Sequence, residues 1–305
     1  MQRATTEILY YEHSPDNAPT MRVQPGETFE VHTQMNKGPW IDELPKTEQE
    51  YWNSKILGGN PSSGAIWVEG AEPKHVLSVH IESIEVHGVG YTRYSGSTGA
   101  MPGWLGPSNI GPQHKVVRIE DGEIIWNKDL RLPIAPMLGV VGVAPANERR
   151  SNAWAGEWGG NFDIQEITQG ATVHIPIQVS GALLHIGDMH ARQGDGEICG
   201  GGGIETGGLA RLRVGLSDCP TAMTWPRIEN ATHIMTTGQA RPAEDAFRIA
   251  LSEMILWLEQ DYAMSKGEAF MFLAQVLEAR VTQFVNPTYS YIAKVNKKWL
   301  NGNRH

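Results

Sequence analysis

The sequence is poor in cysteine and in basic residues, and it contains no long apolar run. Two cysteines among 305 residues exclude a disulfide framework and favour a reducing compartment. Lysine and arginine number 25 against 34 aspartates and glutamates, and the net charge of −9 argues against a nucleic-acid or polyphosphate partner. No stretch approaches the roughly 18 apolar residues of a membrane-spanning helix. Residues 1–16 lack the apolar core of a signal peptide, so we expect a cytoplasmic protein.

Several common catalytic signatures are also missing. The sequence has no G-x-S-x-G turn, no serine–serine–lysine arrangement and no phosphate-binding loop. The glycines at 200–203 lack the lysine and hydroxyl residue that such a loop requires. Cys199 has no nearby lysine to complete a glutamate–lysine–cysteine set, so a buried structural thiol is favoured over a nucleophile.

Residues 1–235 have the pattern of a β-rich body. Apolar and polar residues alternate in segments that glycine and proline separate at short intervals, which is typical of a sandwich or barrel. The alternating segments are 28–32, 65–69, 75–82, 114–119 and 171–177. Residues 139–144 are uniformly apolar and predict a buried strand. We therefore expect a mainly β fold, sandwich-like or barrel-like.

Residues 236–305 have a different pattern, which predicts a helical segment packed on the β body. Pro242 followed by acidic residues is a helix start, and apolar residues then recur at helical spacing to Leu258. Ser265 and Glu268 fit a capping box, which opens a second helix to about Phe284. The two helices are expected to form a hairpin, so that the fold is α+β overall.

Two parts of the β body resemble each other weakly. Residues 70–82 and 181–188 align loosely, and Glu82 then falls opposite Asp188. A body made of two related β halves that meet at one site is therefore one architecture to consider. In that architecture Glu82 joins the site.

The segment 187–208 places polar, metal-binding side chains among glycines. Asp188 and His190 are two residues apart, so an extended backbone points both to one face. An imidazole and a carboxylate suit zinc and related divalent ions. Asp163, in the glycine-led segment 159–163, is a third candidate ligand. The sequence thus predicts a divalent metal site, with zinc as the preferred ion and calcium as a structural alternative.

Other polar residues near these ligands are candidates for catalysis. Glu197 is the candidate general base, because a carboxylate beside a metal can accept a proton from water and pass it to a leaving amine. Asn161 could polarise a carbonyl or orient an amide, and Asp195 is either a catalytic residue or a turn former. The residues left open as further members of the site are Asp16, Glu82, Cys199 and Glu205.

Four segments together resemble the acetamidase/formamidase family. They are Val68–Pro73 (V-E-G-A-E-P), the apolar run from Gly139 to Pro145, Gly159–Asp163 (G-G-N-F-D) and His190–Glu197 (H-A-R-Q-G-D-G-E). The resemblance runs from about residue 13 to 290. It implies a mainly β fold, a homo-oligomer, an associated divalent metal, and hydrolysis of formamide, acetamide or similar short amides to the acid and ammonia. Residues 88–99 depart from the loop expected in this family, which bears on substrate choice.

Two alternative functions remain open at this stage. One is a hydrolase of a bulkier or cyclic amide, such as a lactam, with an apolar pocket formed by tryptophans. The tryptophans considered are Trp40, Trp52, Trp67, Trp104, Trp154 and Trp158. The other is a non-catalytic protein that holds a structural cation, for which calcium would be coordinated by Asp188, Asp195 and Glu197.

Overall fold

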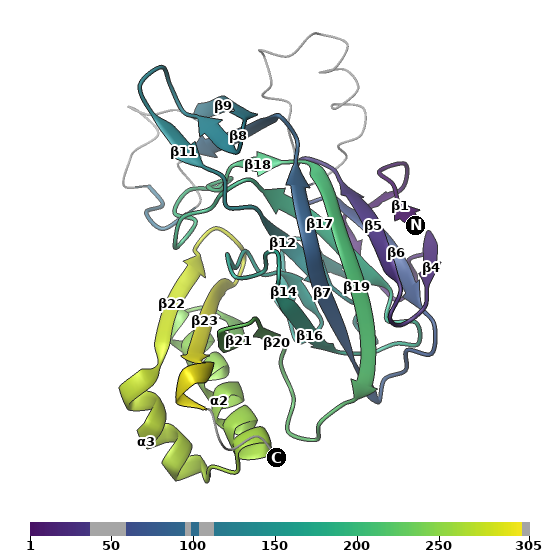
Figure 1. The fold of residues 1–305 in the computed structure, drawn as a ribbon, viewed down its shortest axis with the longest axis vertical. Helices are drawn as coiled ribbons and strands as arrows, with labels where there is room; N and C mark the ends of the chain where they lie inside the picture. The colour runs from purple at the N-terminus through teal and green to yellow at the C-terminus, as the bar shows by residue number, and fades with distance from the viewer. Residues whose placement is uncertain (37–58, 95–98, 104–112, 301–305) are drawn as a thin grey trace.

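The structure is a computed structural model, and it describes residues 1–36, 59–94, 99–103 and 113–300. Within these residues two large β-sheets pack against each other, and two helices lie against the C-terminal strands (Figure 1). In the described part of the chain, no helix is both long enough and apolar enough to cross a membrane.

The first sheet contains nine of the described strands and continues from the body into the C-terminal region. Its strands in spatial order are β1 (Arg3–Ala4), β5 (Thr28–Thr33), β19 (Gly208–Asp218), β7 (His75–Val86), β16 (Thr172–Pro176), β20 (Arg227–Glu229), β21 (His233–Ala240), β23 (Tyr289–Asn296) and β22 (Glu278–Gln283). Neighbouring strands are antiparallel except for β1 and β5.

The second sheet contains twelve of the described strands. Its main path is β11 (Arg131–Pro133), β10 (Glu123–Ile125), β9 (Gln113–Glu120), β8 (Val89–Tyr94), β18 (Glu205–Thr206), β17 (Leu184–His190), β12 (Met137–Gly142), β15 (Gly159–Asn161) and β14 (Ala155–Gly156). Off this path are β2 (Leu9–Tyr10), β4 (Met21–Val23) and β6 (Ser62–Val68). A separate pair is formed by β3 (Glu12–His13) and β13 (Arg150–Ser151).

Strand β17 is central to the second sheet. β12 pairs along one of its edges, while β6 and β18 share the other. All seven residues of β17 are buried, and so are all six of β12. Side chains of β17 are therefore held between neighbouring strands, away from water.

The main hydrophobic core lies between the two sheets. Phe29, Leu77 and Leu212 come from the first sheet, and Leu138 and Ile186 come from the second; all five are fully buried. Full burial of such a side chain contributes roughly 1.5–3 kcal/mol. The predicted mainly β fold is confirmed, and of the two forms considered the face-to-face packing of the sheets is that of a sandwich.

The strands predicted from alternation are present. The five alternating segments correspond to β5, β6, β7, β9 and β16, and residues 139–144 enter the buried strand β12. Residues 70–82 and 181–188, which resemble each other, enter β7 of the first sheet and β17 of the second. A division into two related halves stays a prediction.

Helix α2 (Ala243–Tyr262) begins directly after Pro242, as predicted. The acidic residues in its first turn interact favourably with the helix dipole. Its buried face packs Met254 and Leu258 against Ile234 of β21 and Val295 of β23. The helical region thus has its own small core on the C-terminal end of the first sheet. Because that sheet runs across residue 235, the division of the chain into 1–235 and 236–305 remains a prediction.

Helix α3 (Lys266–Val276) is shorter than predicted. It begins with the expected cap, in which Ser265 Oγ accepts a hydrogen bond from the backbone N–H of Glu268. The prediction that it continues to about Phe284 is wrong, because residues 278–283 form β22 and pair with β23. Val281 and Thr282 are β-branched and favour this extended conformation. The C-terminal region therefore ends in a β-hairpin followed by the short 3-10 helix η1 (Lys297–Trp299).

Candidate functional site

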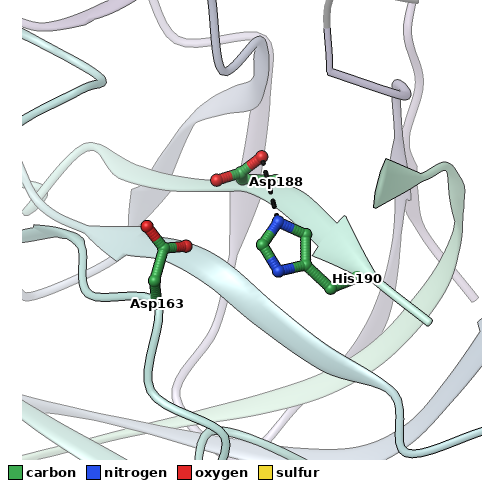
Figure 2. A group of neighbouring side chains, drawn as sticks. All are labelled: Asp163, Asp188 and His190. Atoms are coloured by element: carbon green, nitrogen blue, oxygen red, sulfur yellow. Dashed lines mark ion pairs between the residues drawn. The ribbon is translucent and has the colours of Figure 1, made fainter. Parts of the chain in front are cut away.

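Five buried titratable side chains gather at one end of β17. Asp188 and His190 lie on β17 itself, Glu205 lies on the adjacent β18, and Asp163 follows β15. Glu197 lies in the loop between β17 and β18. Each of the five is at most 4% exposed. Figure 2 shows Asp163, Asp188 and His190 pointing toward one another.

The ligand-type atoms of these residues are close together. His190 Nε2 lies 3.2 Å from Glu205 Oε2 and 3.7 Å from Asp188 Oδ1, the latter drawn as a dashed line in Figure 2. Two groups of three residues each bring one nitrogen or oxygen per side chain within 4.8 Å of one another. The first group is Asp163, Asp188 and His190, and the second is His190, Glu197 and Glu205. The structure therefore joins two three-residue groups through His190.

Backbone strain is concentrated at this cluster. Asp163, Asp188 and Glu197 have φ angles of 46°, 52° and 38°, in the left-handed region that residues other than glycine rarely adopt. Such conformations cost of order 1–3 kcal/mol each and persist where the surrounding structure enforces them. The fold thus accepts strain at the positions that direct these carboxylates inward.

Burial and mutual repulsion shift the protonation of the carboxyl groups. Burial, and then the charge of Asp188, raise the pKa of Asp163 to about 7. Burial, followed by the charge of Glu205, also raises the pKa of Asp188, and burial together with Asp163 raises that of Glu197 well above its usual range. Burial alone would lower the pKa of His190, but the facing Glu205 and Asp188 carboxylates raise it well above its usual range.

The cluster fits a divalent cation. One side-chain atom on each of its five members is buried without a hydrogen-bond partner of acceptable geometry, although buried polar atoms are normally paired. These atoms are Asp163 Oδ1, Asp188 Oδ1, His190 Nε2, Glu197 Oε2 and Glu205 Oε2. Carboxylate oxygens with one imidazole nitrogen form a donor set that suits zinc, and the imidazole makes calcium the poorer match.

Three carboxamide side chains border the cluster, and none of them is among the residues predicted for the site. Asn60 Nδ2 donates a hydrogen bond to Asp188 Oδ2, and Asn286 Nδ2 donates one to Asp163 Oδ2. Gln193 Oε1 contacts His190 Nδ1 at 2.9 Å. Gln193 lies inside the conspicuous His190–Glu197 segment, so its position was a usable signal. Asn286 gave no signal, because it lies just beyond the predicted end of the second helix at about Phe284.

Some residues predicted for the site lie outside the cluster. The Asp195 side chain is 67% exposed and forms a 2.7 Å ion pair with Arg280. Cys199 is half-buried, and burial raises the pKa of its thiol. Asp16 pairs with Arg149, and Glu82 with Arg213.

Asn161 is close in sequence to Asp163, a member of the cluster. It is buried on β15 opposite Val140, and its Oδ1 has no hydrogen-bond partner. It precedes Asp163 by two residues, so its backbone belongs to the same segment that delivers this carboxylate.

A polar cavity borders the cluster through Asn60. Its lining residues are Asn36, Gly59, Asn60, Tyr91, Arg93, Gly200, Gly201 and Val285. Since Asn60 also donates a hydrogen bond to Asp188, this residue connects the cavity wall with the cluster. Tyr91 and Arg93 belong to the 88–99 segment that departs from the family pattern, of which residues 95–98 lie outside the described part.

The described tryptophans do not line this cavity. Trp67 packs against Arg22, while Trp154 and Trp158 pack against Arg150. Trp40, Trp52 and Trp104 lie outside the described residues.

Similarity to known proteins agrees with the sequence motifs. A model of the acetamidase/formamidase family matches residues 150–290. An acetamidase from Bacillus halodurans with a known crystal structure is 31% identical, with a TM-score of 0.86, and the alignment covers 98% of this chain and 99% of that one. The chain belongs to the acetamidase/formamidase family. This confirms the resemblance seen in the sequence.

Two further acetamidase/formamidase relatives support this membership. A predicted acetamidase/formamidase from Thermoanaerobacter tengcongensis is 30% identical, with a TM-score of 0.89 over 99% of this chain and 97% of that one. The acetamidase of Mycolicibacterium smegmatis is 44% identical over 73 residues, which are 24% of this chain. That match spans only 18% of the curated relative's own length.

A γ-lactamase from Delftia acidovorans has the same fold. Its TM-score is 0.61, and the alignment covers 96% of this chain and 90% of that one at 18% sequence identity. At this identity the similarity concerns the fold alone.

Proposed function

We propose that this protein is a metal-assisted amidohydrolase that cleaves short aliphatic amides to a carboxylate and ammonia. The observation that carries the proposal is the buried group of five ligand-type atoms that form no hydrogen bond of acceptable geometry. They occur in a member of a family whose named relatives are acetamidases and formamidases. A small amide substrate, a homo-oligomeric state and a cytoplasmic location are proposed on the same family resemblance and on the sequence.

Asp163, Asp188 and His190 are the residues that would hold the ion, and Glu205 faces the same point. A bound divalent ion supplies Lewis acidity, which polarises an amide carbonyl and makes water a stronger acid. Zinc is the ion we propose, because the donor set mixes oxygen with one imidazole nitrogen.

Glu197 has the environment of a general acid–base. Its Oε2 is buried and unpartnered, and its pKa is raised well above the usual range by burial and by Asp163. A carboxyl group of this kind can hold a proton near neutral pH. We propose that Glu197 Oε2 accepts the proton of the attacking water and returns it to the departing nitrogen.

Asn161 and the glycine loop are proposed to assist the substrate. Gly200 and Gly201 line the cavity next to Asn60, so their backbone N–H groups are candidates to stabilise the oxyanion of the tetrahedral intermediate. The Asn161 carboxamide, buried on β15, is the side-chain candidate for the same role.

The deciding experiment is ammonia release from formamide, acetamide and a small lactam, before and after chelator treatment and after zinc or calcium is restored. Release that stops with the chelator and returns with zinc supports the proposal and ranks the substrates. A lactam turned over faster than formamide would shift the substrate class to cyclic amides. Chelation that lowers thermal stability, with no amide cleaved under any condition, would leave a non-catalytic cation-binding protein.

A further inference from the structure

We infer that Asn60, Gln193 and Asn286 are positioning residues that orient the three metal ligands. Each carboxamide engages one polar atom of one ligand: Asp188 Oδ2, His190 Nδ1 and Asp163 Oδ2 respectively. The other atom of each ligand, Asp188 Oδ1, His190 Nε2 and Asp163 Oδ1, forms no hydrogen bond of acceptable geometry and belongs to the cluster. The inference rests on the proposed function, because it concerns the same metal site.

Gln193 fixes the tautomer of His190. Gln193 Nε2 donates to two backbone carbonyls, Asp163 O at 2.9 Å and Thr282 O at 3.0 Å. Since a carbonyl only accepts, these two bonds decide which end of the carboxamide is nitrogen. Oε1 therefore faces His190 Nδ1 at 2.9 Å and can only accept, so that Nδ1 carries the proton. Nε2, which faces the Glu205 and Asp188 carboxylates, is then the ring nitrogen that would give up its proton and bind the ion.

The two asparagines act on the carboxylates in the same manner. Asn60 Nδ2 lies 3.2 Å from Asp188 Oδ2, and Asn286 Nδ2 lies 2.7 Å from Asp163 Oδ2. Each bond occupies one oxygen and fixes the plane of the carboxylate, leaving Oδ1 directed at the cluster. A carboxamide does this without a net charge, whereas a lysine or arginine at the same place would compete with the cation for the carboxylate.

The C-terminal β-hairpin thereby becomes part of the site. Its turn is shaped by Gln283, whose Oε1 accepts hydrogen bonds from the backbone N–H groups of Val285 and Asn286 at 2.9 Å. The hairpin is attached to the site loop where Phe284 N donates to Gly196 O at 2.8 Å, and where Gln193 bonds Thr282. Asn286 is therefore held against Asp163 from a strand pair that belongs to the other sheet.

The test is the dissociation constant for zinc, measured by calorimetry on the full-length protein. We expect Gln193→Met and Asn286→Leu each to weaken zinc binding about 10–100-fold, the usual effect of losing an outer partner of a metal ligand. Gln239→Met is the matched control: Gln239 is a buried glutamine that bonds Trp225 outside the cluster. It should leave the zinc dissociation constant unchanged. Equal zinc affinity in wild type and in both site variants would overturn the inference.

A second readout needs no substitution. In the zinc-loaded wild-type protein, ¹⁵N NMR of the His190 imidazole should show a protonated Nδ1 and a metal-bound Nε2. A metal-bound Nδ1 would sink the inference even if the variants failed to fold. Wild-type protein that binds no zinc would instead refute the proposed metal centre, so the two failures are distinguishable.

Discussion

A β-carbon placed on Gly139 would lie 2.5 Å from Asp163 Oδ1. The same carbon would lie 2.8 Å from Asp188 Oδ2 and 2.9 Å from the Asp188 carbonyl oxygen. Gly139 lies on the buried strand β12, so a methyl group there would enter the space between the two carboxylates. Because residue 139 is glycine, the carboxylate oxygens of Asp163 and Asp188 can occupy these positions without a steric clash.

Gly139→Ala should therefore damage the metal site. We expect zinc affinity to fall at least about tenfold, with about 1–3 kcal/mol of lost stability from overpacking. Gly215→Ala is the control, because a β-carbon there would meet only Ser78 Cβ, at 3.9 Å. Zinc titration and urea denaturation of both variants would check this. Unchanged zinc binding in Gly139→Ala would contradict the proposed ligand positions.

Glu197→Gln should reduce amide turnover by about 10²–10⁴-fold, since it removes the group proposed to move the proton. Zinc content should stay the same if Glu197 acts only as acid and base. Asp195→Asn makes the same chemical change two residues away, on a side chain that is 67% exposed, and should keep turnover within a few-fold of wild type. Ammonia release and metal analysis of both proteins test this pair. Zinc loss in Glu197→Gln would show that Glu197 is a ligand. Equal loss of turnover in the Glu197 and Asp195 variants would show that Asp195 is also part of the catalytic site.

Zinc binding should weaken as the pH falls below 7. The pKa of Asp163 is raised to about 7 by burial and by Asp188, so at pH 6 the ion must displace a proton that is already gone at pH 8. Each proton displaced costs about tenfold in affinity per pH unit below that pKa. Calorimetry at pH 6 and 8, in two buffers with different ionisation heats, measures both the affinity and the protons released. No proton release at pH 6 would contradict this account.

His13 should make the protein sensitive to acid. Its ring is fully buried, and burial lowers its pKa to about 3, while the neighbouring Asn152 side chain opposes this shift. Above pH 6.5 the ring is neutral in both folded and unfolded chains. Between pH 6.5 and about 3 only the unfolded chain takes up this proton, so the contribution of His13 to stability falls by about 1.4 kcal/mol per pH unit.

Urea denaturation of metal-free protein at pH 7, 6 and 5 measures this slope. His13→Gln should reduce the slope of the free energy of unfolding against pH by up to about 1.4 kcal/mol per pH unit, which corresponds to one proton. Thr236→Val removes a buried hydrogen bond to Ala250 but no titratable group, and should lower stability equally at each pH. A slope that is the same in His13→Gln as in wild type would be evidence against the buried neutral ring.

The fold was largely predictable because its strands have local signals. Alternation and burial coincide in segments such as β16, and Pro242 and Ser265 mark the helix starts. The end of the second helix was not predictable locally. Residues 278–283 become a strand because β23, which follows them, offers a pairing partner, and this is a tertiary effect.

The candidate site was predictable where its members are close in the sequence. Asp188 and His190 share a strand, and the many glycines around Glu197 and Glu205 indicated a functional loop in the sequence. Asn286 and Asp163 are 123 residues apart in the sequence, so no local sequence pattern could predict their hydrogen bond. Asp195 could not be placed from the sequence, because a motif position does not reveal whether its side chain turns inward or pairs with Arg280 at the surface.

The docking of the hairpin also has a consequence for biosynthesis. On a translating ribosome Asp163 is made 123 residues before Asn286, which is roughly 6–25 s at the usual elongation rates. During that interval strand β17 lacks both the carboxamide that bonds Asp163 and the Thr282 carbonyl that anchors Gln193. The proposed metal site can therefore be complete only after the hairpin has folded back onto the sandwich.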